Sequence, residues 1–248
     1  MFNNSVKYLI RSHIFLALFS FVFLYGLNIN YEGALTYSLT ICSGILGVYN
    51  SHRLWKYYKG RLPSDIHLWT LNNYRSLLIL AFSNLVASSI LYSIYFSGNR
   101  TQNIFAFVCL LTSIFYVKKV NKRSLREIPY LKLFVVMAIW YTLFFVFPNM
   151  LFGANQDWGV SLIFLLVILI PSDMKDVHVD HKHMRTIPQV LGLNGSVKFL
   201  KIILFFTLAV LFFNGLFLTN EAAWKWGFIY LLILSFTFNQ IGYRYFFV

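Results

Sequence analysis

Long apolar stretches, separated by short polar or charged segments, are the main pattern of this 248-residue chain. Each stretch is close to the ~20 residues that an α-helix needs to cross a bilayer, and Tyr, Trp or polar residues at the ends complete the shorter ones. The pattern predicts an all-α, multi-pass transmembrane bundle of about eight helices. The predicted helices lie at about 9–28, 33–50, 76–96, 102–117, 131–148, 157–172, 199–218 and 224–242.

The composition agrees with a membrane protein and excludes several other classes. Hydrophobic residues make up 58% of the chain and charged residues only 12%, whereas soluble globular domains carry about 25% charged residues. A disordered chain, a disulfide-rich secreted module and a soluble nucleic-acid-binding protein are therefore excluded. The two cysteines, Cys42 and Cys109, lie inside apolar stretches and are interpreted as small buried hydrophobic residues.

The net charge of +13 is interpreted mainly as a signal of membrane orientation. If the eight helices alternate in direction, 19 of the 21 Lys and Arg residues lie on one side, and only Arg100 and Lys225 lie on the other. Because basic residues concentrate in cytoplasmic loops, both termini and the long loops are predicted to be cytoplasmic, in a plasma (inner) membrane. Membrane lipids are the expected counter-charge. No nucleic acid and no obligate protein partner are expected.

Two polar helix ends lie half a chain apart. Asn50 ends the second predicted helix and Asp173 ends the sixth, 123 residues later. Because both helices are predicted to run toward the cytoplasm, the first four and the last four helices are interpreted as two parallel repeats around a central cavity. The two polar ends then meet at one cytoplasmic opening.

Three of the eight acidic residues are close together at the end of the sixth predicted helix. Asp173, Asp176 and Asp180 share one helix face, because their spacing is i, i+3 and i+7. Carboxylates so placed repel one another, and Mg²⁺ is a cation that binds carboxylates together with substrate phosphates. The spacing therefore favours a magnesium site. The alternative is a solvated helix end that neighbouring basic residues neutralise.

The segment after the aspartates carries signals of local structure. Thr186 and Gln189 have capping-box spacing, Pro188 suits the first turn of a helix, and Gly192 is expected to end that short helix. This segment is therefore predicted to be ordered and to cover the opening. Helix starts attract anions, which fits a phosphorylated ligand.

The order of these residues resembles a motif of a known family. After the three aspartates come Arg185, Thr186, Ile187, Pro188, Leu191 and Gly192. Together they resemble the second aspartate-rich motif of the UbiA superfamily of intramembrane prenyltransferases. The basic segment 116–132, which leads to Trp140, resembles the family's connection between helices 4 and 5.

The resemblance implies a single UbiA-like transmembrane domain over residues 1–248. It also implies Mg²⁺-dependent transfer of a prenyl group from an isoprenyl diphosphate to an aromatic or other lipophilic acceptor. Asp173, Asp176 and Asp180 would be the catalytic metal ligands. The residues expected to bind the substrate are Asn50, Arg53, Lys56, Lys119 and Arg185.

The sequence departs from the family in the first motif, which has the pattern Asn-Asp-x-x-Asp. Asn50 matches, but Ser51 and Leu54 stand where the family has carboxylates. Two outcomes are open. Arg53, Lys56 or protonated His52 pairs with the diphosphate in place of a metal ion, since guanidinium groups suit phosphate oxygens. Alternatively, the chain is a catalytically inactive UbiA-like protein that binds lipid or acts as a scaffold.

Overall fold

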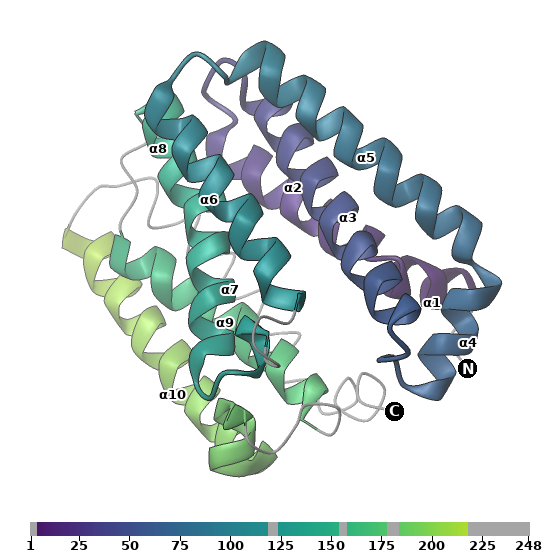
Figure 1. Cartoon of the computed structure of the whole chain (residues 1–248). Coiled ribbons are helices and arrows are strands. Elements are labelled where there is room, and N and C mark those ends of the chain that lie inside the picture. The colour runs from purple at the N-terminus through teal and green to yellow at the C-terminus, as the bar shows by residue number, and fades with distance from the viewer. Residues whose placement is uncertain (1–3, 119–123, 154–157, 178–183, 218–248) are drawn as a thin grey trace. The chain divides into compact units, whose positions relative to one another are not determined.

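A computed structural model describes residues 4–118, 124–153, 158–177 and 184–217, and within these ranges every regular element is a helix (Figure 1). The contacts divide the chain into two units, each described here by itself. Unit 1 is Met1–Val120 with Thr142–Asn155, and unit 2 is Asn121–Tyr141 with Gln156–Val248. The elements are α1 (Asn4–Arg11), α2 (Ile14–Asn28), α3 (Ala34–Tyr58), α4 (Ser64–Asn72), α5 (Tyr74–Tyr95), α6 (Arg100–Val117), the 3₁₀ turn η1 (Leu125–Glu127), α7 (Leu131–Tyr141), the π-helical turn η2 (Thr142–Val146), α8 (Phe147–Phe152), α9 (Trp158–Asp176) and α10 (Ile187–Phe217).

In unit 1, helix α3 packs against both α2 and α5 (Figure 1). The contact with α5 is close because glycines line it: a Cβ at Gly47 would lie 2.8 Å from the side chain of Leu85 and 3.0 Å from its backbone nitrogen. Beside it, Ser88 Oγ donates a hydrogen bond to Thr40 O at 2.9 Å. Small residues that let two helices approach closely are typical of packing inside membranes.

The π-helical turn η2 gives unit 1 an internal hydrogen bond. A π turn disrupts the regular i to i−4 ladder and leaves a carbonyl available to a side chain. The hydroxyl of Tyr37, a buried residue of α3, donates to the carbonyl oxygen of Leu143. The space beside Tyr37 is about 10 Å³, which is room for about one water molecule.

In unit 2, helix α9 packs against α7 and α10, and η1 packs against α7. The segment between η1 and α7 is joined to the residues just before α10, because Tyr130 N donates a hydrogen bond to Met184 O at 2.9 Å. Tyr130 and Met184, which are far apart in the sequence, therefore lie side by side within this unit.

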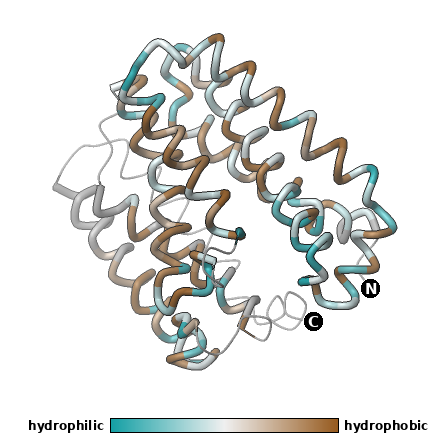
Figure 2. The backbone as a smooth tube through the Cα atoms, viewed as in Figure 1, coloured by the Kyte–Doolittle hydropathy of each residue, from teal (hydrophilic) through white to brown (hydrophobic). Residues whose placement is uncertain are grey.

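Four helices of the described chain are long and apolar enough to cross a membrane: Tyr74–Tyr95, Arg100–Val117, Leu131–Phe152 and Ile187–Phe206. Helix α5 shows why, because its apolar side chains point outward at regular helical spacing; Ile79, Phe82 and Ile90 are each more than half exposed. Figure 2 shows the apolar colouring along α5 and α6. An exposed apolar helix face of this length is expected in lipid and not in water.

The predicted apolar stretches from 9–28 to 199–218 coincide with helices at their described residues, and 224–242 lies outside them. Two features differ from the prediction. The first stretch is broken at Ser12 and His13, which separate α1 from α2, and the polar connection after α3 contains the short helix α4.

Candidate functional site

A buried ion pair marks the polar end of unit 2. Asp173 lies in the last turn of α9 and Lys132 in the first turn of α7. Lys132 Nζ is 2.8 Å from Asp173 Oδ1, and the two side chains are only 6% and 8% exposed. Removing two charges from water is costly, so the pair is stable only because each charge compensates the other. It therefore fixes the start of α7 against the end of α9.

Arg185 is joined to the same part of unit 2. Its side chain is exposed, and Nη1 donates to the hydroxyl of Tyr130 at 3.4 Å. Both residues have positive backbone φ angles, 47° for Arg185 and 63° for Tyr130, a region that non-glycine residues seldom adopt. The hydrogen bond between Tyr130 N and Met184 O holds this paired turn together. Arg185 is thus linked to Asp173 through residues 130–132.

The predicted short helix after the aspartates is confirmed. Thr186 N donates to the side-chain Oε1 of Gln189 at 3.2 Å, which is the backward bond of a capping box. Gly192 has φ 71° and interrupts α10, as expected of a glycine that ends a helix. Ser196 Oγ then donates to Gly192 O at 2.8 Å, so the restart of the helix is also tied to this glycine.

Of the three aspartates predicted to hold Mg²⁺, Asp173 is the one whose side chain the structure describes. Asp173 already has an ammonium group at 2.8 Å, which competes with a metal ion for the same oxygen. The side chain of Asp176, all of Asp180 and all of Lys119 lie outside the described residues. Among the residues that are described, no group of three or more His, Cys, Asp and Glu could hold a metal ion. Asp173 is therefore better suited to positioning the helix end than to binding metal directly.

In unit 1, Asn50 is fully buried on α3 and binds backbone. Its Nδ2 donates to Ser12 O at 2.8 Å and to Leu46 O at 2.9 Å. The bond to Ser12 crosses from α3 to the break between α1 and α2, where His13 adopts a left-handed φ of 61°. The amide nitrogen of Asn50 thus holds the chain at this break.

The basic residues that follow Asn50 lie beyond the apolar stretch 33–50. Arg53 is half-buried, and its Nη2 lies 3.0 Å from Nε2 of His13. Lys56 is half-buried in the last turn of α3. Burial, together with the charge of Lys56, lowers the pKa of His52 to about 4. A protonated His52 at neutral pH, one of the options for binding diphosphate, is therefore disfavoured.

A shallow pocket of about 370 Å³ opens at the turn between α4 and α5. Its lining residues are Tyr57, Leu71, Asn72, Asn73, Tyr74, Arg75 and Ser76. The rings of Tyr57 and Tyr74 lie 5.8 Å apart at its edge. Because it is wide and open, this pocket is a surface depression at the polar end of unit 1 and not an enclosed lipid cavity.

Sequence reasoning missed two of these contacts. Lys132 is counted among the basic residues of one membrane side and within the segment 116–132, but no partner is predicted for it, although an ionisable residue in an apolar stretch often has a specific partner. His13 carries no local signal for its contact with Arg53, because that contact depends on tertiary packing. Asn50 and Arg53 lie in one unit, and Asp173 and Arg185 lie in the other.

Comparisons of the chain with models of protein families, with curated proteins and with solved structures find no match. The residues and their geometry therefore carry the functional argument.

Proposed function

We propose that this membrane protein is a UbiA-like prenyltransferase, which transfers a prenyl group from an isoprenyl diphosphate to a lipophilic acceptor. The observation that supports the proposal is the ion pair between Asp173 and Lys132. It joins the aspartate segment to the basic segment 116–132, and these are the two parts of the chain that resemble the family. The proposal includes eight helices in two parallel repeats, a single domain over 1–248, and cytoplasmic termini in the plasma membrane.

In this proposal the residues of the aspartate segment have separate tasks. Asp176 and Asp180 hold Mg²⁺, while Asp173, fixed by Lys132, orients the end of α9 from which they extend. Bound magnesium supplies positive charge that stabilises a leaving diphosphate. Arg185 is exposed beside Tyr130 and offers a planar guanidinium that suits phosphate oxygens.

Binding of a prenyl diphosphate to the purified protein in detergent tests the proposal. Titration calorimetry with and without Mg²⁺ is expected to show binding that requires the metal. Asp176→Asn should remove that requirement together with most of the affinity. Glu32→Gln, which neutralises an exposed acid of unit 1, is the matched control and should leave both unchanged. Binding that does not require magnesium and is unchanged by Asp176→Asn would contradict the proposal.

A second candidate, a non-catalytic protein that binds lipid or acts as a scaffold, is favoured by one observation in unit 1. The amide nitrogen of Asn50 is engaged by Ser12 O and Leu46 O, and no acids follow at positions 51 and 54. Adding the missing carboxylates by Ser51→Asp with Leu54→Asp separates the two functions. The variant should bind Mg²⁺ more tightly if α3 takes part in a diphosphate site, and should be unaffected if the chain is a scaffold.

A further inference from the structure

Two arginines share one tryptophan ring at the polar end of unit 1. The guanidinium carbon of Arg53, on α3, lies 5.4 Å from the centre of the Trp69 ring on α4, and that of Arg11, on α1, lies 5.8 Å from it. The Tyr8 ring is 5.8 Å from the same tryptophan. We call Arg11, Arg53 and Trp69 the arginine–tryptophan cluster. Three different helices thus bring two cations to one aromatic ring.

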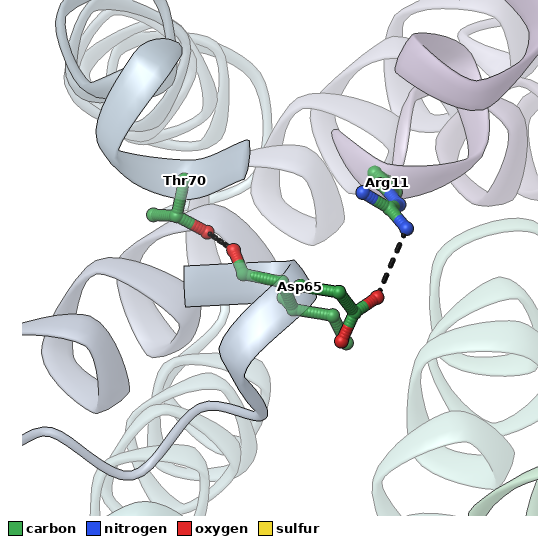
Figure 3. Close-up of polar contacts among 4 residues, drawn as sticks. Arg11, Asp65 and Thr70 are labelled. Atoms are coloured by element: carbon green, nitrogen blue, oxygen red, sulfur yellow. Dashed lines mark hydrogen bonds and ion pairs between the residues drawn. The ribbon is translucent and has the colours of Figure 1, made fainter. Parts of the chain in front are cut away.

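The positive charge of this cluster is only partly balanced by the residues described around it. Arg11 Nη2 binds Asp65 Oδ2 at 3.1 Å, and the Asp65 side chain is 64% exposed (Figure 3). Arg53 Nη2 instead lies 3.0 Å from the ring nitrogen Nε2 of His13. Its Nη1 is buried and has no hydrogen-bond partner within the described chain. A buried N–H donor without an acceptor is costly, and more so in a charged group.

Burial, and next the charge of Arg11, lower the pKa of Arg53 to about 10. The group nevertheless stays protonated at neutral pH. Two cations and one exposed carboxylate therefore leave a net positive charge in a partly buried site. An anion bound at the cluster would offset this charge and offer an acceptor to the guanidinium groups.

The surroundings of the cluster fit the surface of a membrane. Helices α1 and α4 are short and lie at the same end of unit 1 (Figure 1). Each exposes two large apolar side chains, Leu9 and Ile10 on α1, and Leu68 and Leu71 on α4. Short helices with exposed apolar residues and arginines are typical of the lipid interface, where Trp and Tyr also concentrate.

We propose that the arginine–tryptophan cluster binds a phosphate group. Arginine forks match the geometry of phosphate oxygens, and the two guanidinium groups supply donors from different helices. The apolar side chains that α1 and α4 expose beside the cluster favour the phosphate of an anionic phospholipid over a soluble phosphate compound. The site is independent of the proposed transferase function, since it uses unit 1 alone and requires no magnesium.

The test uses purified full-length protein in nanodiscs of phosphatidylcholine, without Mg²⁺ or prenyl diphosphate. Phosphatidylglycerol is added in steps, and retention of individual lipids is measured by native mass spectrometry. Arg53→Gln should weaken phosphatidylglycerol binding about tenfold or more, the effect of losing one charge-assisted hydrogen bond. Arg61→Gln, an exposed arginine near the end of α3, makes the same chemical change outside the cluster and should have no effect.

A variant that binds phosphatidylglycerol more tightly than the wild type tests the site without relying on a loss that misfolding could also cause. Asp65→Asn releases Arg11 and removes the one nearby carboxylate, so it should strengthen binding several-fold. A larger loss of phosphatidylglycerol affinity with Arg53→Gln than with Arg61→Gln, together with tighter binding by Asp65→Asn, supports the site. Equal effects of the two arginine variants, or weaker binding by Asp65→Asn, would overturn it.

A second arm identifies the source of the phosphate. Inorganic pyrophosphate is titrated against the protein in a zwitterionic detergent that contains no anionic lipid, and the same variants are compared. If Arg53→Gln weakens the binding of phosphatidylglycerol but not of pyrophosphate, the phosphate comes from a lipid. If it weakens the binding of pyrophosphate alone, the lipid source is overturned and the ligand is a soluble phosphate compound. Both arms are run without Mg²⁺, which the transferase proposal requires, so failure of the transferase proposal and failure of this site are distinguishable.

Discussion

The polar ends of the two units stabilise their buried polar side chains in different ways. In unit 2, a buried carboxylate and a buried ammonium compensate each other, 2.8 Å apart. In unit 1, a buried amide binds backbone carbonyl groups, a half-buried arginine contacts a histidine ring nitrogen, and the ion pair between Arg11 and Asp65 is exposed. Unit 2 therefore has a buried pair of charges at its polar end, whereas unit 1 has a buried amide and keeps an excess of positive charge.

The difference indicates separate roles for the two ends. A closed ion pair positions helices accurately but has little need of a ligand. The open donor of Arg53 is satisfied best by an anion from outside the chain. Substitutions should therefore cost more stability in unit 2 and change ligand binding more in unit 1.

The largest effect is expected from Lys132→Met, which leaves the carboxylate of Asp173 buried without its ammonium partner. Loss of one member of a buried pair costs about 3–5 kcal/mol in the free energy of unfolding. Thermal unfolding in detergent measures it, with the exposed Lys198→Met as control. Adding Asp173→Leu to Lys132→Met should restore most of the stability. Equal stability of the two single lysine variants would show that the pair has no energetic role.

Asn50→Ala is expected to have the next largest effect. It removes both donated hydrogen bonds and leaves Ser12 O without that donor, at a cost of about 1–3 kcal/mol. Ser51→Ala, at the next position of α3, is the control in the same unfolding measurement. A cost no greater than that of the control would mean that Asn50 does not hold the break between α1 and α2.

Tyr37→Phe tests a single neutral hydrogen bond in unit 1. The variant loses the donor to Leu143 O at the π turn, and the expected loss of stability is about 1 kcal/mol. Tyr95→Phe, at an exposed position of α5, should be neutral. If the loss at Tyr37 reached that of Lys132→Met, the contrast between charged and neutral sites would be wrong.

The smallest effect concerns pH and His52. The pKa of His52 is lowered to about 4 in the folded protein. As pH falls below the ordinary histidine pKa of about 6.5, the unfolded chain therefore takes up a proton at this residue before the folded protein does. Stability should therefore decrease as pH falls from about 6.5 toward 4, by less than about 1 kcal/mol down to pH 5.5. Melting temperatures of the wild type and His52→Gln at several pH values measure this decrease, with His67→Gln as control. An unchanged pH slope in His52→Gln would contradict it.

Local features of the structure were accessible from the sequence. The apolar stretches predict helices because a run of about 20 apolar residues is a local signal. Thr186, Gln189 and Gly192 likewise predict a short capped helix, and the hydrogen bond of Gln189 and the φ angle of Gly192 confirm it. Spacing along the chain was enough in these cases.

Contacts between distant segments were not accessible in the same way. Lys132 and Asp173 come together only through the packing of α7 against α9. The left-handed turn at His13 is accompanied by a hydrogen bond from Asn50 to Ser12, which no pattern near residue 13 indicates. The binding of Mg²⁺ and of a prenyl diphosphate stays a prediction.

Mapping the sites labelled by a photoreactive isoprenyl diphosphate analogue tests the central claim most directly. The analogue is crosslinked to the purified protein with and without Mg²⁺, and mass spectrometry identifies the labelled peptides. The account predicts labelling within 124–132 or 173–192 of unit 2 only when magnesium is present. Labelling confined to other segments, or the same pattern without magnesium, would contradict it.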